Sequence, residues 1–320
     1  IVGFVLILMF SLCGCEIKEE TDNLQNVTIV LDWFPNTNHT GLYVADQKNY
    51  YAEEGLAVEI VQPTEGGTAQ LIGAGKGDFG ISYQEEVLMA RDSHIPVKAI
   101  AAIIQHNTGG YASPVEKGIT SPADFIYRTY GGAGTPSESA LLKALMQNYE
   151  QDVTAINQIN IGSADFFTSI EKDIDFSLIY YGWTGVEAEI RGIEIDFIPL
   201  KDEDDRLDFY TPVIITNENK IKNDALLIEK FMRATSKGYE YAINNPIEAA
   251  DILVKAVPEL DKELVQASQK YLANEYKSDA DKWGEIELER WEGFTNFMYD
   301  NNLITEKIEA EQAFTNKFLP

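Results

Sequence analysis

Aromatic, amide and carboxylate side chains recur in the connections that follow the predicted strands of this chain. Trp33 and Asn38 follow the first apolar strand, and Asn107 follows a later one. Trp183 and Glu187 are four residues apart at a predicted helix start, so helical geometry would place them on one face. Aromatic faces hold a planar ring by stacking, and a carboxylate pairs with an amine or amidine group. The candidate ligand-binding residues are Trp33, Asn38, Tyr83, Glu85, Asn107, Tyr181, Trp183 and Glu187.

Each of these aromatic residues, taken alone, is more typical of a core than of a binding site. Their recurrence in connections from both halves of the chain favours a ligand cleft, because open α/β sheets bind ligands at the carboxyl ends of their strands. The sequence therefore predicts a flat-walled site for a small molecule.

Other chemistries have little support in the sequence. It has no Gly-x-Ser-x-Gly elbow for hydrolysis, and His39, His94 and His106 do not form a paired metal motif. His39 and His106 both follow strands and could meet in space, where they would act as hydrogen-bonding or structural residues. Residues 73–77 (GAGKG) depart from the phosphate-binding loop pattern, and such glycines are typical of a helix end. We expect neither a metal nor a cofactor.

The elements that would position this site form two α/β halves. Apolar strands alternate with helical patterns from residue 27 to residue 104, which predicts a mostly parallel sheet with helices on both faces. A polar, glycine-rich boundary follows at 105–114, and the alternation then restarts. After a strand at 210–215, the chain is mostly helical and is expected to pack back onto the first half. The predicted late helices span 224–244, 246–256, 261–272, 283–301 and 306–318.

Composition and charge narrow the class of protein. The 320 residues are long enough for two domains, and the net charge of −27 gives a surface that phosphate backbones repel. We therefore expect no nucleic-acid partner. The simplest interpretation of the acidity is a soluble surface that resists association.

The amino-terminal segment has the pattern of a secretion signal. Residues 1–12 are almost entirely apolar but too short to span a bilayer. The chain has only two cysteines, Cys13 and Cys15, so a disulfide or a thiolate nucleophile in the folded body is excluded. Residues 12–15 (LCGC) resemble a bacterial lipobox, which implies that residues 1–14 are removed and that Cys15 carries a lipid. The alternative is a cleaved signal without a lipid. Residues 15–26 would form a polar tether.

Three stretches together resemble one known family. Residues 31–41 (LDWFPNTNHTG), 80–85 (GISYQE) and 181–185 (YGWTG) are similar to the substrate-binding lipoproteins of thiamine-pyrimidine ABC importers, the NMT1/THI5-like branch of periplasmic binding proteins. The resemblance covers essentially the whole mature chain. It implies a type II periplasmic-binding-protein-like α/β fold with two lobes around a ligand cleft, lobe 1 from 27–108 and 212–320 and lobe 2 from 109–211.

The resemblance also implies a function. The protein would be an extracytoplasmic monomer, held at the bacterial cell membrane only by its lipid, that binds an aminopyrimidine precursor of thiamine and delivers it to a permease with its ATPase. The lobes would close on the ligand about the crossovers near 107–114 and 205–212. Family contacts carry over to Trp33, Asn38, Tyr83, Trp183 and Glu187.

Two departures from the family pattern bear on this function. Relatives often have a tryptophan where this chain has Ala133, which leaves the particular pyrimidine open. An enzymatic branch makes the pyrimidine from one of its own histidines, and Glu86 stands at the matching position here. The alternatives are therefore a pyrimidine synthase, or a binding protein for another flat or anionic solute (riboflavin-like, sulfonate or nitrate). A carboxylate at Glu187 argues against anions.

Overall fold

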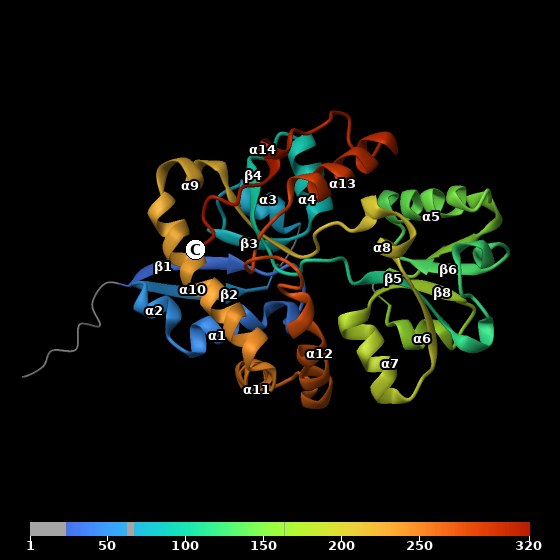
Figure 1. The fold of residues 1–320 in the computed structure, drawn as a ribbon, viewed down its shortest axis with the longest axis horizontal. Coiled ribbons are helices and arrows are strands. Elements are labelled where there is room, and N and C mark those ends of the chain that lie inside the picture. The colour runs from blue at the N-terminus through green and yellow to red at the C-terminus, as the bar shows by residue number, and fades with distance from the viewer. Residues whose placement is uncertain (1–23, 63–66, 163) are drawn as a thin grey trace, which may run out of the picture.

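The strands of the protein form two five-stranded sheets that lie side by side in the computed structural model, which describes residues 24–62, 67–162 and 164–320 (Figure 1). The first sheet has the order β2-β1-β3-β10-β4, and the second has the order β7-β6-β8-β5-β9. The first sheet consists of β1 (Gln25–Val30), β2 (Leu56–Val61), β3 (Phe79–Ser82), β4 (Val97–Ala102) and β10 (Val213–Asn217). The second consists of β5 (Gly109–Pro114), β6 (Thr129–Gly132), β7 (Asn157–Asn160), β8 (Phe176–Tyr180) and β9 (Ile195–Pro199).

Helices pack on both faces of each sheet. Successive residues of a strand therefore belong to different hydrophobic cores. Val213 and Ile215 belong to one hydrophobic cluster, whereas Ile214 belongs to another. This alternation is the period-two pattern of strands. The longer helices are α1 (Thr40–Gln47), α4 (Gln84–Asp92), α5 (Pro136–Asn148), α10 (Ala225–Asn244), α11 (Pro246–Ala256), α12 (Lys262–Glu275) and α13 (Leu288–Asp300). The shorter ones are α2 (Tyr50–Glu53), α3 (Thr68–Gly73), α6 (Phe166–Ile170), α7 (Val186–Arg191), α8 (Leu200–Glu203), α9 (Glu218–Asn223) and α14 (Ala310–Ala313). Single turns are η1 (Thr37–His39), η2 (Val115–Lys117), η3 (Pro122–Phe125), η4 (Val153–Ala155), η5 (Tyr181–Gly185) and η6 (Asp205–Leu207).

Each sheet is mixed, with one antiparallel strand. β10 runs antiparallel to β3 and β4, and β5 runs antiparallel to β8 and β9. These are the strands that receive the chain after it crosses from the other sheet. A chain that arrives at the carboxyl edge of a sheet must run against its neighbours. The carboxyl ends of the remaining strands therefore face the gap where the chain crosses.

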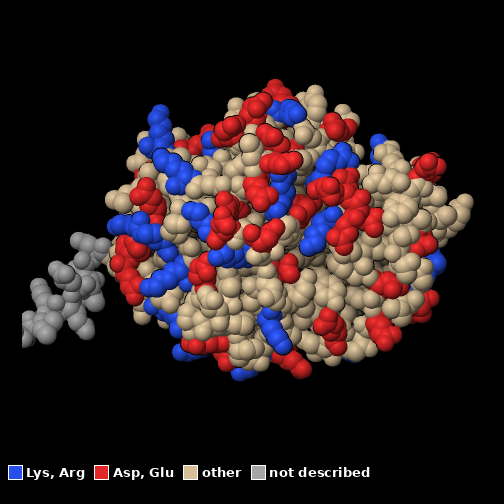
Figure 2. Space-filling view, viewed as in Figure 1, with Lys and Arg blue, Asp and Glu red and all other residues tan. Residues whose placement is uncertain are grey.

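We propose two lobes, lobe 1 formed by 27–108 and 212–320 and lobe 2 by 109–211. The division of the strands between the two sheets supports this proposal. Acidic side chains gather over the middle of the face in Figure 2, and basic ones are frequent at its lobe 1 end.

β1 begins at Gln25, two residues before the expected start. The predicted signal, Cys13, Cys15 and the tether up to residue 23 lie outside the described residues. Within the described ranges, no helix has the length and apolar character needed to cross a membrane.

The late helices agree with the sequence patterns except at the start of α13, which begins at Leu288 and not at residue 283, and at the end of the chain. α10 and α11 occupy 225–244 and 246–256, close to the predicted ranges. The predicted helix over 306–318 was wrong, since only α14 forms there. Instead, Phe314 pairs with Ala99 in a parallel bridge, and the Thr315 N–H donates to the Ala99 carbonyl at 2.9 Å. β4 is the edge strand of its sheet, and this extended tail satisfies part of that open edge.

Candidate functional site: a cavity between the lobes

A cavity of about 440 Å³ lies between the two lobes, within the usual range for small-molecule sites. Residues after β1 and β3 form its lobe 1 side, and residues at the end of β8 form its lobe 2 side. Four of the eight predicted residues line it: Trp33, Asn38, Tyr83 and Trp183. The other lining residues are Asp32, Asn36, Thr37, Ile104, Thr108, Tyr180, Gly182, Thr184, Thr211, Pro212 and Leu272.

The connection after β1 is held rigidly by its own capping box. The Asn36 side-chain oxygen accepts a hydrogen bond from the Asn38 N–H at 2.8 Å, and the Asn36 N–H donates to Nδ1 of His39 at 3.2 Å. The Tyr239 hydroxyl of α10 donates to the Asn38 carbonyl at 2.7 Å. The backbone is thus fixed from both sides, which leaves the side chains of Trp33 and Asn38 free to face the cavity.

Large aromatic surfaces stand exposed at this cavity. Trp33 is 56% exposed, and Tyr83, at the amino-terminal cap of α4, is 38% exposed. Tyr180 contributes a third ring, 47% exposed, from the last position of β8. Aromatic surface that stays in water within a concave site is available to stack on a flat ligand.

A single π-helical turn, η5, shapes the lobe 2 wall. It follows β8 directly and places Gly182, Trp183 and Thr184 at the cavity. Tyr181 points elsewhere, because its hydroxyl donates to Oε1 of Glu189 at 2.6 Å and its ring lies 5.4 Å from that of Tyr271. The hydrogen bond to Glu189, with burial, raises the pKa of Tyr181 to about 12. Tyr181 therefore supports the wall and does not line the cavity.

Glu187 does not share the cavity with Trp33. Its carboxylate pairs with Arg191 one turn further along α7, and it lines a neighbouring cavity of about 290 Å³. Tyr180, Trp183 and Thr184 line both cavities. Trp183 lies in a π turn and not in an α-helix, yet Trp183 and Glu187 both line this neighbouring cavity, so the two side chains do share a face. Ala133 also lines the neighbouring cavity.

Glu85 and Asn107 do not line the cavity either. Glu85 lies in the first turn of α4, where burial raises its pKa against a hydrogen bond with Ser137. The Asn107 side chain is 1% exposed, and it donates to the Leu207 carbonyl at 2.9 Å while accepting from the Gly109 N–H at 2.8 Å. Asn107 therefore joins the two crossovers, and its burial keeps it out of contact with a ligand in the cavity.

His106 and Asp208 form a second link between the crossovers. His106 lies after β4, and its Nδ1 is 2.6 Å from Oδ2 of Asp208, which precedes β10. Its Nε2 is 2.9 Å from Oδ1 of Asp279. The hydrogen bond with Asp208 raises the pKa of His106 despite partial burial. His39 and His106 do not contact each other. His39 pairs with Asp32, and Nε2 of His39 lies 2.8 Å from Oδ1 of Asp32.

Helix α12 connects lobe 1 to the lobe 2 wall (Figure 1). Its Ser268 hydroxyl lies 2.6 Å from the Thr37 hydroxyl and also donates to the Gly182 carbonyl. Thr37 and Gly182 line opposite sides of the cavity. Ser268 is fully buried, so this contact holds the two walls together.

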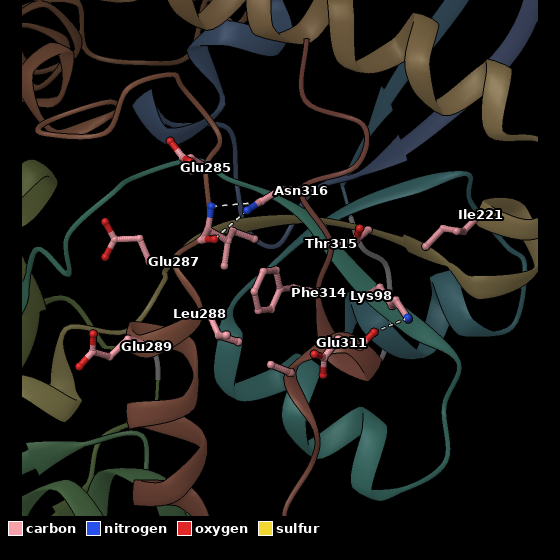
Figure 3. Close-up of a pocket in the computed structure, with 12 residues that line it drawn as sticks. Lys98, Ile221, Glu285, Glu287, Leu288, Glu289, Glu311, Phe314, Thr315 and Asn316 are labelled. Carbon is pink, nitrogen blue, oxygen red and sulfur yellow. Dashed lines mark hydrogen bonds between the residues drawn. The ribbon is translucent and has the colours of Figure 1, made fainter.

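A larger cavity, of about 720 Å³, lies in lobe 1 against the edge strand β4 (Figure 3). Phe314 lies inside it, and Lys98 reaches across to donate to the Glu311 carbonyl at 2.5 Å. Asn316 and Ile286 exchange hydrogen bonds at 2.8 and 3.0 Å on its rim. None of the predicted binding residues lines it, and only lobe 1 builds it.

Sequence reasoning missed several residues of the interlobe cavity. Asp32 and Tyr180 directly precede predicted aromatic residues, and their strand-end positions were a usable signal. Thr211, Pro212 and Leu272 come from remote parts of the chain, and only the fold brings them here. Within the described residues, no group of three or more His, Cys, Asp or Glu side chains is arranged to hold a metal ion.

The two lobes and the cavity between them define a two-lobed protein with the periplasmic-binding-protein fold. The periplasmic aliphatic sulphonate binding protein of Escherichia coli superposes with a TM-score of 0.72 at 12% identity, covering 90% of this chain and 96% of that one. At such low identity the likeness concerns the fold alone. Residues 36–249 match the model of the family described as NMT1/THI5 like, and the chain belongs to that family.

Curated relatives of the chain differ in what their names say. The formylaminopyrimidine-binding protein of Halalkalibacterium halodurans is 27% identical over 99% of this chain and 98% of its own length. The riboflavin-binding protein RibY of Chloroflexus aurantiacus is 27% identical over 93% and 87%. The 4-amino-5-hydroxymethyl-2-methylpyrimidine phosphate synthase of Legionella pneumophila is 25% identical over 92% of both chains.

Proposed function

We propose that this protein is the extracytoplasmic solute-binding component of an ABC importer and that it binds a thiamine-precursor aminopyrimidine. The observation that carries the proposal is the interlobe cavity, which has aromatic walls from both lobes and the volume of a small-molecule site. The relative named for formylaminopyrimidine matches over almost the whole chain and supports this ligand class.

The rest of the transport system belongs to the same proposal. A lipid on Cys15 would hold the protein at the outer face of the bacterial cell membrane, and a permease with its ATPase would receive the ligand. We propose that the protein acts as a monomer, without a cofactor. Globomycin treatment of the producing cells, which blocks lipoprotein processing, is expected to retain the precursor if Cys15 is lipidated.

Binding would combine stacking with polar contacts. The rings of Trp33, Tyr83 and Trp183 would sandwich the pyrimidine, and the Asn38 amide would pair with a ring nitrogen or substituent. The Ser268 contact to both walls supports closure around the ligand, since closure excludes water and strengthens polar contacts.

Ligand binding is the direct test of this function. A thermal-shift and calorimetry panel would contain formylaminopyrimidine, hydroxymethylpyrimidine, thiamine and riboflavin. A ligand at 100 times its dissociation constant is expected to stabilise the protein by about 2.7 kcal/mol. Stabilisation by a pyrimidine alone would support the proposal, whereas stabilisation by riboflavin alone would favour the alternative that the RibY relative suggests.

Trp33→Ala is expected to weaken pyrimidine binding by about 2 kcal/mol, because it removes one stacking wall. The melting temperature of the free protein should change little, since Trp33 is 56% exposed. Phe34→Ala is the matched control. Phe34 contacts Trp33 edge to face at 5.7 Å and is 66% exposed, but it does not line the cavity. Calorimetry that finds equal losses in both variants would exclude stacking by Trp33.

The synthase alternative receives less support from the geometry. Glu86 stands at the position that matches the reactive histidine of the enzymatic branch. Its carboxylate accepts hydrogen bonds from the Ser82 hydroxyl at 2.5 Å and from the Ala69 N–H at 3.2 Å. This side chain therefore serves to join β3 to the start of α3.

A further inference from the structure

Asp32 is the single charged side chain among the described residues that line the interlobe cavity. It lies between β1 and the capped turn η1, and 19% of its side chain is exposed. No Lys or Arg is found among those lining residues to neutralise it. Resting on the function proposed above, we propose that Asp32 selects flat rings that carry an amine and rejects anionic ones.

The hydrogen bonds around His39 keep the Asp32 charge uncompensated. Nδ1 of His39 accepts a hydrogen bond from the Asn36 N–H at 3.2 Å, so this nitrogen carries a lone pair. The ring proton is therefore on Nε2, which donates to Oδ1 of Asp32 at 2.8 Å. A neutral imidazole orients the carboxylate without cancelling its charge. His39 is fully buried, so the orientation is fixed by the fold.

The second carboxylate oxygen, Oδ2, is the one available to accept a hydrogen bond from a ligand. Among the described residues, Oδ2 of Asp32 has no hydrogen-bond partner, while Oδ1 is held by His39. An exocyclic amine donates a hydrogen bond that such an oxygen accepts, and a protonated ring nitrogen beside the amine adds a second. A phosphate or sulfonate in the same place would meet a like charge in a partly dry cavity.

Glu187 cannot supply this selectivity. Its charge is paired with Arg191, and it lines the neighbouring cavity. The carboxylate that recognises the amine of the ring is therefore that of Asp32, beside Trp33 on the lobe 1 side.

Calorimetry with Asp32→Asn tests the inference. The probes are 4-amino-5-hydroxymethyl-2-methylpyrimidine, the same molecule without its amine, and its phosphate ester. The asparagine oxygen still accepts from Nε2 of His39, so the fold is kept. Loss of the charge is expected to weaken binding of the amine-bearing probe about 10- to 100-fold and to leave the probe without an amine almost unchanged. The wild type should not bind the phosphate ester.

Asp300→Asn is the matched control for the loss of one negative charge. Asp300 is the exposed last residue of α13, a helix that contributes nothing to the cavity lining. Its affinities should equal those of the wild type. Asp32→Ser, which removes the carboxylate altogether, provides a second variant, and thermal unfolding of each free variant tests its folding.

The outcomes separate this inference from the proposed function. Wild-type affinity for the aminopyrimidine in both Asp32 variants, or a preference of the wild type for the phosphate ester, would overturn the role of Asp32 alone. If the wild type binds no pyrimidine, the same comparison is made with adenine and unsubstituted purine. Adenine binding that depends on Asp32 would refute the pyrimidine ligand and support the selectivity, and binding of neither amine would overturn both.

Discussion

Trp283→Ala is expected to lower the free energy of unfolding by about 3–5 kcal/mol, the range for truncating a fully buried large aromatic residue. The Trp283 side chain is 1% exposed, and its ring stacks on that of Tyr239 at 4.2 Å with an interplanar angle of 11°. Its indole N–H donates to the Ile103 carbonyl at 3.2 Å. The substitution therefore creates a cavity and leaves a buried carbonyl without its donor.

The same substitution is expected to weaken ligand binding, because Trp283 supports the cavity from behind. Tyr239, on which it stacks, donates to the Asn38 carbonyl, and Ile103 precedes Ile104, which lines the cavity. Urea unfolding measures the first effect and calorimetry the second. Trp33→Ala is the control for losing a tryptophan, and its unfolding free energy should stay within about 0.5 kcal/mol of the wild type. A loss below 1 kcal/mol for Trp283→Ala would show that its pocket is not the rigid core described here.

Local patterns in the sequence were sufficient to predict the two α/β halves and most late helices. The range of α11 agrees with its apolar period because Pro246 can start a helix and the period continues to Ala256. The antiparallel direction of β5 and β10 depends on where the chain re-enters each sheet, which no local pattern encodes. The extended tail around Phe314 likewise depends on the open edge of β4, more than 200 residues earlier.

The cavity lining was predictable for residues within three positions of a strand end. Trp33 and Tyr83 line the cavity because such positions face the gap between the lobes. Glu187 was predicted from its spacing to Trp183, and the two do line one cavity together, but only Trp183 also lines the interlobe cavity. Asn107 has the residue type of a ligand contact, but its amide joins the crossovers. Distinguishing these two uses of an amide requires the partner, Leu207, which lies 100 residues away.

Asp208→Asn is expected to lower the free energy of unfolding by about 3 kcal/mol near pH 6, the lower end of the cost of breaking a buried ion pair. The lower end applies because His106 and Asp208 are 20% and 17% exposed. Besides His106, the Asp208 carboxylate accepts from the Asn107 N–H at 2.8 Å and lies 3.5 Å from Nε of Arg290. The contacts with His106 and Asn107 join the segment after β4 to the segment before β10, and Arg290 adds a contact from α13.

The size of this effect should depend on pH in a defined direction. The hydrogen bond with Asp208 raises the pKa of His106 above its ordinary 6.5, so this stabilisation is fully present below pH 6.5 and is lost as the pH rises through the raised value. Burial acts to raise the pKa of Asp208, but the hydrogen bonds from His106 and Asn107 lower it overall. Its stabilisation is present above 3.8, the ordinary value, and is lost as the pH falls through the lowered one. The link is therefore strongest between about pH 3.8 and 6.5.

Urea unfolding of the wild type, Asp208→Asn and His106→Gln across this range tests the link. The difference between the wild type and either variant should be largest near pH 5–6 and should shrink toward alkaline pH, as His106 loses its proton. Asp205→Asn removes an exposed carboxylate three residues away and should give a difference that is small and independent of pH. A difference for Asp208→Asn that does not shrink toward alkaline pH would mean that the neutral imidazole holds the crossovers at least as well as the charged one. Because the lobes would close about these crossovers, a constant difference would predict a ligand affinity that is also independent of pH over this range.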